Sequence, residues 1–176
     1  MPRTTPEKPT EAETRRTLMA YYEDLSPYRY HHFKPDETHV NVGWLEWEYP
    51  FTQGPVESAI TSKIGELCKY PVNLMRGFQE CRRCNPPHVM VKEPVGLNGE
   101  MIFLGNGEIH IAGQDKTYIC PTLIYHYMLR HAYQPPQEFL DAVHALPGQN
   151  VKDEPESTGP SLFRRLLTSC RFPRRS

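Results

Sequence analysis

The segment with the most chemical content is Cys81-Arg82-Arg83-Cys84. Two cysteines separated by two residues place both sulfurs on one side of a tight turn, and zinc sites use this knuckle repeatedly. A knuckle supplies two ligands, whereas a closed structural zinc site needs four. The sequence therefore predicts a second pair of ligands on a separate element.

The best candidates for the second pair are His126 and His131, on a helix expected after Pro121. Four residues lie between them, a spacing that zinc fingers use. Positions i and i+5 of an ideal helix lie about 140° apart, so we expect a tightened or unwound last turn. Pro135-Pro136 predict that the helix ends nearby. The predicted Zn²⁺ ligands are Cys81, Cys84, His126 and His131.

Each of these assignments has alternatives. His88 is the strongest rival ligand, because it follows Cys84 by four residues, and His110 is another. Cys68 and Cys120 are also rivals, but we interpret them as small buried hydrophobic residues. The two helix histidines have a second interpretation as core residues that hydrogen-bond to backbone carbonyls.

Glu108 and His110 form a second candidate pair. They stand two residues apart on a predicted strand and therefore on one face of it. Beside a metal-activated water they could act as base and ligand, but we prefer an exposed strand face. The chain has no His-Glu-x-x-His, no Gly-x-Ser-x-Gly and no Lys-bearing phosphate loop. A zinc-dependent hydrolase or nuclease-like enzyme with an open metal position is therefore the alternative, and a non-enzymatic protein is favoured.

The elements that must position these residues predict an α+β fold. Three helices are expected, beginning at Pro55, Pro121 and Pro135-Pro136. Short strands are predicted over residues 41–45, 72–75, 101–104, 109–111 and 118–120. Gly105-Asn106-Gly107 predicts a hairpin between the strands on either side of it. The expected fold is a small mixed domain of short antiparallel strands and about three helices around a zinc-finger-like centre.

Composition divides the 176 residues into a domain and two tails. Residues 1–20 are predicted to be a flexible lead, 21–147 the zinc-stabilised domain, and 148–160 an acidic Pro-rich linker. Residues 161–176 form an Arg/Leu-rich tail that we expect to dock on a protein partner. An anionic surface, the chain's own domain and simple disorder are the alternatives for this tail. Its predicted partner-binding residues are Arg164, Arg165, Leu166 and Leu167.

Charge and hydropathy exclude several classes of protein. The net charge of −1 argues against a general nucleic-acid binder. Contact with an anion or a nucleic acid through Arg82, Arg83 and the Arg-rich tail is the weakest of the hypotheses. No window approaches the roughly 20 apolar residues of a transmembrane helix, and the first residues do not resemble a secretory signal. An odd number of cysteines, five, at low density favours the reducing cytoplasm.

An ordered set of motifs resembles an uncharacterised family of small bacterial proteins. The motifs are residues 24–28 (DLSPY), 41–45 (NVGWL), 71–78 (PVNLMRGF), Cys81-x2-Cys84, 104–109 (LGNGEI) and 125–139 (YHY-x3-H-x-Y-x-PP-x2-F). The resemblance spans about residues 24–145 and implies a bacterial, cytosolic setting. It includes the four predicted zinc ligands and implies no activity. The sequence thus favours a protein-interaction module with a structural zinc site.

Overall fold

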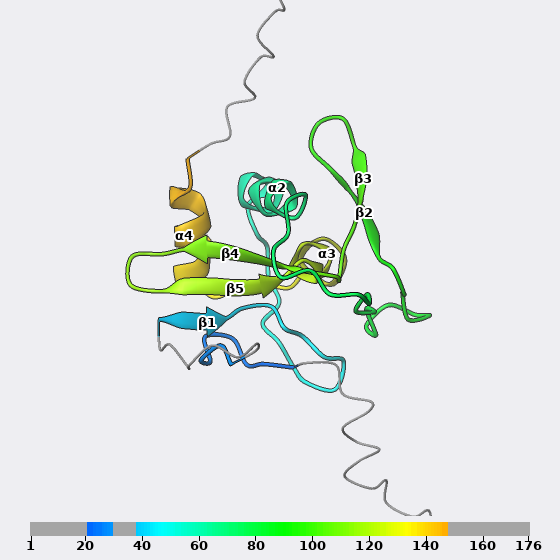
Figure 1. Ribbon diagram of the computed structural model, residues 1–176, viewed down its shortest axis with the longest axis horizontal. Coiled ribbons are helices and arrows are strands. Elements are labelled where there is room, and N and C mark those ends of the chain that lie inside the picture. Colours follow the sequence, from blue (N-terminus) through cyan, green and yellow to red (C-terminus); the bar gives the residue numbers. More distant parts are fainter. Residues whose placement is uncertain (1–20, 30–37, 148–176) are drawn as a thin grey trace, which may run out of the picture. The chain divides into compact units, whose positions relative to one another are not determined.

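The computed structural model describes residues 21–29 and 38–147, and it has an α+β fold (Figure 1). The described part contains three helices and five short strands, which confirms the predicted fold class. The elements are β1 (His39–Asn41), α2 (Ser58–Leu67), β2 (Lys92–Val95), β3 (Glu100–Phe103), β4 (Glu108–Ala112), β5 (Thr117–Pro121), α3 (Leu123–His131) and α4 (Gln137–Ala145). The predicted lead (1–20), linker (148–160) and tail (161–176) lie outside the described residues, and so do Arg164, Arg165, Leu166 and Leu167.

The strands form two separate sheets. The larger sheet has the order β1-β5-β4. In it β4 runs antiparallel to β5, whereas β1 is parallel to β5 with Val40 opposite Tyr118. The smaller sheet is the antiparallel pair of β2 and β3, which Figure 1 shows as a hairpin of its own. Local patterns predicted short strands, but they did not reveal that the first strand pairs with the last.

Both faces of the larger sheet are covered. Successive residues of a strand face opposite sides, so Tyr118 and Ile119 point in opposite directions. Tyr118 meets Phe139 of α4 edge to face, with ring centroids 5.6 Å apart. Ile119 packs with Tyr28 and Trp44, which come from the segments before and after β1. One face therefore meets the helices, and the other meets the first described residues of the chain.

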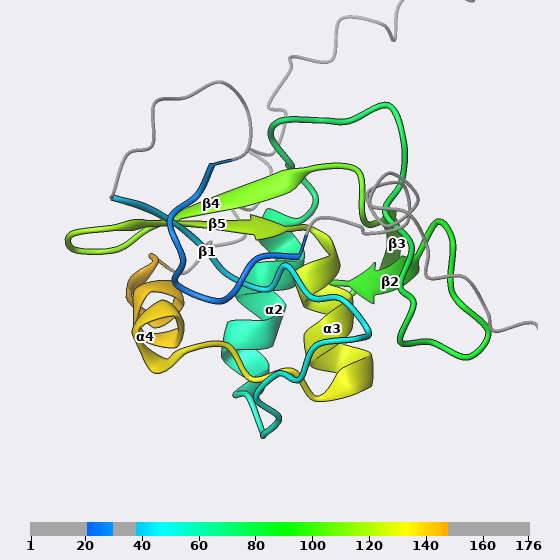
Figure 2. The same cartoon turned by 90° about the horizontal axis from the view of Figure 1, so that it is seen from below.

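The helices pack side by side. Figure 2 shows α4, α2 and α3 in a row, and α2 contacts both of the others. Between α2 and α3 the approach is close, because a Cβ added at Gly65 would lie 2.9 Å from the ring of Tyr125. The first six residues of α3 (123–128) are all buried, as expected for a helix enclosed on all sides. This enclosed helix is the one that carries the two predicted histidine ligands.

The hairpin predicted across Gly105-Asn106-Gly107 is wrong. The strand before it pairs with β2, and the strand after it pairs with β5. Gly105 has φ +97°, and a Cβ there would lie 2.6 Å from the carbonyl oxygen of Gln79. The carbonyl of Asn106 accepts a hydrogen bond from the N–H of Met75. The glycine therefore permits close contact with a neighbouring segment, a role that the local sequence does not distinguish from a hairpin turn.

Two other predicted strands differ from the structure. The strand expected over 41–45 is β1, which ends at Asn41. Beyond β1 the indole N–H of Trp44 donates to the carbonyl of Ile119 at 3.0 Å. The strand expected over 72–75 is reduced to one bridge between Val72 and Glu108, because Asn73 has the left-handed φ of +49°.

Candidate metal centre

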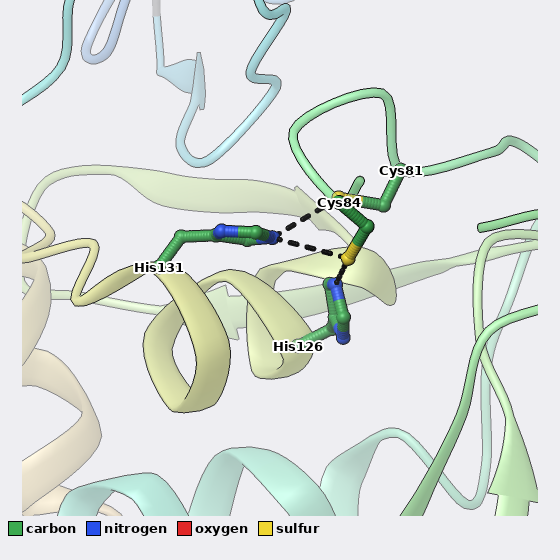
Figure 3. Close-up of side chains that lie close together, drawn as sticks. All are labelled: Cys81, Cys84, His126 and His131. Carbon is green, nitrogen blue, oxygen red and sulfur yellow. Dashed lines mark hydrogen bonds between the residues drawn. The ribbon is translucent and has the colours of Figure 1, made fainter. Parts of the chain in front are cut away.

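Four side chains converge on one point between the knuckle and α3 (Figure 3). One ligand-type atom from each of the four residues lies within 4.8 Å of all the others. The Nε2 atom of His131 lies 3.2 Å from the Sγ of Cys81 and 3.6 Å from that of Cys84. The Nε2 atom of His126 lies 3.3 Å from the Sγ of Cys84. The four residues are those that the sequence predicted: Cys81, Cys84, His126 and His131.

Backbone hydrogen bonds shape the knuckle. The N–H of Cys81 donates to the carbonyl of His88, and the N–H of His88 donates to the carbonyl of Cys81, both at 2.9 Å. This reciprocal bridge closes a loop that contains Cys84. Figure 3 shows the sulfurs of Cys81 and Cys84 on the side that faces the two histidines of α3. His88, the strongest rival ligand, therefore closes the knuckle with its backbone. Its side chain is exposed and is not one of the four.

The end of α3 brings the two histidines together. The helix continues through His131, and Ala132 ends it with a left-handed φ of +52°. The N–H groups of Ala132 and Tyr133 both donate to the carbonyl of Tyr127. The predicted nearby helix end is thus present, directly after the second histidine. The ring centroids of His126 and His131 are 5.1 Å apart. The two side chains therefore reach the same point although their positions lie on different sides of the helix.

The donor set fits zinc. Zinc in a tetrahedron of thiolates and imidazoles holds sulfur and nitrogen ligands about 3.6 Å apart, from bond lengths of about 2.3 and 2.0–2.1 Å. The sulfur–nitrogen distances here are 3.2, 3.3 and 3.6 Å. Two thiolates with two imidazoles are the ligands that tetrahedral zinc prefers. The cluster can therefore hold a zinc ion with small adjustments of its side chains.

Burial affects the protonation of these ligands in different ways. It lowers the pKa of His126 and of His131 below the ordinary histidine value, so both rings are neutral at pH 7, as metal ligands must be. Burial raises the pKa of the Cys81 thiol to about 11. A bound cation favours the thiolate and opposes that shift. The site therefore has neutral histidines already and a cysteine that a metal ion would deprotonate.

An ion pair with a buried carboxylate adjoins the cluster. Glu93 of β2 is 2% exposed, and its Oε1 lies 2.7 Å from the Nδ1 of His126. Arg130 donates from Nε to Oε1 at 2.9 Å and from Nη2 to Oε2 at 2.7 Å. Burial acts to raise the pKa of Glu93, but the hydrogen bonds from Arg130 and His126 outweigh it and leave the pKa below its usual value.

Sequence reasoning missed Glu93 and Arg130. The burial of β2 alternates, so that Glu93 and Val95 point inward while Lys92 and Pro94 point outward. A charged residue on the buried face of a strand usually has a specific partner. In the sequence, the weak alternation of apolar and polar residues over 88–95 was the available signal. It did not show which side chains of this strand point into the protein.

The two arginines of the knuckle have partners within the chain. Arg83 donates from Nη2 to the carbonyls of Glu46 and Tyr49, and its guanidinium lies 4.1 Å from the ring centroid of Phe51. Arg82 donates from Nε to Glu80 at 2.9 Å. The contacts of Arg83 fasten the knuckle to the loop after β1, and both arginines use donor groups that an anion site would need.

The other two rival cysteines are buried away from the cluster. The Sγ of Cys68 lies 3.6 Å from the carbonyl of Thr122, and Cys120 is fully enclosed in β5. Burial raises the pKa of both thiols well above the usual cysteine value. Both therefore remain neutral and pack as small hydrophobic residues, in agreement with the interpretation from the sequence.

The preferred interpretation of Glu108 as part of an exposed strand face is wrong. Glu108 is 1% exposed. It accepts hydrogen bonds from Tyr28 at 2.8 Å and from Asn73 at 2.7 Å, and it lies 3.2 Å from the Nε2 of His110. Tyr28 and Asn73 cover this face of the strand at Glu108, whereas His110, two residues along the same face, is exposed. A pattern of alternation cannot reveal such a local cover. Neither Glu108 nor His110 belongs to the cluster of four.

Comparison with known proteins identifies a family and no activity. The model of a family described as Domain of unknown function (DUF7919) matches residues 20–144, so the chain belongs to this family. No curated protein and no solved structure matches the chain. Among the described helices, none has the length and apolar character required to cross a membrane.

Proposed function

We propose that this member of the DUF7919 family binds one structural Zn²⁺ ion through Cys81, Cys84, His126 and His131. The supporting observation is that one ligand-type atom from each of the four residues lies within 4.8 Å of the others. The four residues come from a loop and a helix, and Cys84 and His126 are 42 positions apart in the sequence. Four protein ligands leave no open coordination position for a substrate, which is typical of structural zinc.

The ion would join the knuckle to α3, two parts of the fold that come from distant segments of the chain. Bound zinc neutralises the two thiolates and replaces the hydration that they lose on burial. Because the site forms only when the knuckle meets α3, the binding free energy contributes to folding. The proposed role of the metal is therefore to hold the knuckle and the attached β2–β3 hairpin on the helix.

Exposed apolar side chains support a role in protein interaction. They come mainly from residues 70–74 and 89–103, the segments on either side of the knuckle, and large exposed apolar areas commonly mark binding surfaces. The exposed apolar residues of these two segments are Tyr70, Val72, Leu74, Val89, Met90, Leu97, Met101 and Phe103. We propose that the metal presents this surface to a protein partner. The tail residues Arg164, Arg165, Leu166 and Leu167 are a proposed second contact, and a cytoplasmic location would keep the thiols reduced.

The enzymatic alternative requires water in place of one ligand and a free carboxylate beside it. The carboxylate that contacts the cluster, Glu93, already pairs with His126 and Arg130. Glu108 accepts hydrogen bonds from Tyr28 and Asn73 and is not one of the cluster residues. No contact among the described residues favours the enzyme, so the structural role is the one we propose.

Elemental analysis of the purified, untagged protein tests the metal site. We expect about one zinc per chain, as for a single four-ligand centre, and its loss in Cys81→Ser and in His126→Ala. Cys68→Ala is the matched control, because Cys68 is a buried cysteine outside the cluster and should leave the zinc content unchanged. Fresh reduced protein without metal, or zinc retained in both ligand variants, would contradict the proposal.

A further inference from the structure

Glu93 is an unusual residue for its position. It is the one charged side chain of β2 and β3 that is buried, since Lys92 and Glu100 are exposed. A buried carboxylate is unfavourable unless it is paired and hydrogen-bonded. Both of its oxygens have partners, and both partners come from α3: His126 and Arg130. Both contacts of Glu93 are therefore made with α3, the helix that carries two of the four predicted metal ligands.

We propose that Glu93 is a positioning residue that sets the tautomer and ring orientation of His126 for metal binding. Glu93 accepts a hydrogen bond from the N–H at Nδ1, so the lone pair of His126 is on Nε2. That nitrogen lies on the side of the ring that faces Cys84, 3.3 Å from its sulfur. Carboxylates commonly orient metal-bound histidines in this way. The inference rests on the proposed zinc site.

Arg130 keeps the carboxylate in place. Its Nε and Nη2 atoms contact the two oxygens of Glu93, which is the bidentate geometry of an arginine–carboxylate pair. Arg130 follows His126 by four residues, so both lie on one face of α3. The side chain of Arg130 is 57% exposed and covers the buried carboxylate from the solvent side. Glu93 is therefore held between a fixed cation and the ring that it orients.

The two histidines of the cluster differ in this support. Within the described residues, the ring of His131 contacts both sulfurs and has no carboxylate partner, whereas His126 pairs with Glu93. The end of α3 at Ala132 places His131 instead. His126, in the enclosed part of the helix, is 2% exposed and has a dedicated hydrogen-bond partner.

A purely structural role for Glu93 is the competing explanation. The pair also connects β2 to α3, as does the hydrogen bond from the hydroxyl of Tyr125 to the carbonyl of Pro94 at 2.8 Å. A structural connection predicts an effect on stability alone. A positioning role predicts a change in zinc affinity and in the state of the His126 ring, which can be measured separately.

NMR of ¹⁵N-labelled, zinc-loaded full-length protein reads the tautomer directly. We expect a strongly deshielded Nδ1–H resonance of His126 that exchanges slowly with water. In Arg130→Gln, a change at an exposed side chain that should leave the chain folded, this resonance should shift upfield and exchange faster. A wild-type ring without a proton on Nδ1, or a resonance that is unchanged in Arg130→Gln, would overturn the proposal.

Zinc affinity is measured by competition with a chromophoric chelator. Removal of a group that orients a metal ligand typically weakens binding by about 10–100-fold, and we expect this of Glu93→Ala. The matched control is Glu108→Ala, which also removes a buried carboxylate from a histidine but outside the cluster. Its affinity should equal that of the wild type. Equal losses in both variants, or no loss in Glu93→Ala, would contradict a positioning role.

Zinc binding by the wild type distinguishes a failure of the positioning role from a failure of the proposed metal site. If the wild type binds no zinc, the proposed function fails and the positioning role fails with it. If it binds zinc tightly and the two Glu variants behave alike, only the positioning role fails. If Glu93→Ala does not fold, the wild-type resonance and the Arg130→Gln variant still decide the question.

Discussion

Two regions of this molecule hold their backbone in place by different means. The sheet region consists of β1, β4 and β5 with α2 and α4, and its interior is mostly apolar, with Ile64, Ile119 and Phe139 fully buried. The knuckle region, residues 81–103, leaves most of β3 exposed and buries mainly Cys81, Val91 and Val95. At the interface of this region with α3, the four candidate metal ligands and the Glu93–Arg130 ion pair lie beside these apolar residues.

The same contrast appears in two glutamate–histidine pairs. Glu108 in the sheet region and Glu93 in the knuckle region are almost equally buried. His110 faces Glu108 with Nε2, and that carboxylate also accepts bonds from uncharged Tyr28 and Asn73. His126 faces Glu93 with Nδ1, which leaves Nε2 toward a sulfur. The choice of ring nitrogen therefore separates a structural pair from a candidate metal centre.

The largest expected effect lies in the sheet region. Phe139→Ala removes a fully buried ring from its contact with Tyr118, and such changes lower the free energy of unfolding by about 3–5 kcal/mol. Urea denaturation of the zinc-loaded protein measures this. The zinc content of the folded variant should not change, because no ligand lies in α4. A loss below about 1 kcal/mol would mean that the apolar core does not hold the sheet region.

Removal of zinc should affect the knuckle region most. With free zinc a hundredfold above its dissociation constant, chelation should cost about 2.7 kcal/mol of stability. Hydrogen exchange should accelerate over residues 81–103, while the amides that join β4 to β5 remain protected.

Two buried cysteines provide the control for this experiment. Cys81→Ala should reproduce the effect of the chelator on hydrogen exchange, and Cys68→Ala should not. A uniform acceleration across both regions would show that the metal supports the whole domain equally, which would contradict the proposed difference between the two regions.

The sheet region should carry its own dependence on pH through Glu108. Burial acts to raise the pKa of Glu108, but the hydrogen bonds from His110, Asn73 and Tyr28 outweigh it, so the pKa in the folded state lies below the unfolded value. The stabilisation is therefore complete above about pH 4.5 and is lost as the pH falls through the lower folded value.

Glu108→Gln tests this dependence. We expect it to cost about 2 kcal/mol at pH 7, because it places an amide donor against donors that faced a carboxylate. The measurement is urea denaturation of chelated wild type and variant between pH 7 and pH 3. The difference between the two should shrink in acid. A difference in the free energy of unfolding that stays constant with pH would show that folding does not lower the pKa of Glu108.

The smallest effect is expected on the exposed surface of the knuckle region. Met101 is 56% exposed, and Met101→Ser should change stability by no more than about 0.5 kcal/mol. Val95→Ala, at a buried position in the paired strand, is the control and should cost more. A large loss in Met101→Ser would mean that these apolar side chains serve the fold, which would weaken the proposed interaction surface.

Local patterns predicted much of the site and part of the fold. The spacing of the cysteines and histidines predicted four residues that the structure brings together. Proline positions predicted where the three helices begin to within a few residues. The helix starts agree with the prediction because helix initiation depends on residues that are neighbours in the chain. Each cysteine or histidine pair was likewise found from the spacing within one short segment.

Residue types and their spacing are enough to identify the side chains with the chemistry to hold a metal and the places where helices begin and end. The pairing of the strands, the contact of Gly105 with Gln79 in place of a hairpin turn, and the burial of Glu108 depend on the folded chain. So does the contact of Glu93 with His126 across 33 residues of chain. These features depend on which surfaces meet after the chain has folded, and a local pattern carries no information about the residue on the other side of a contact.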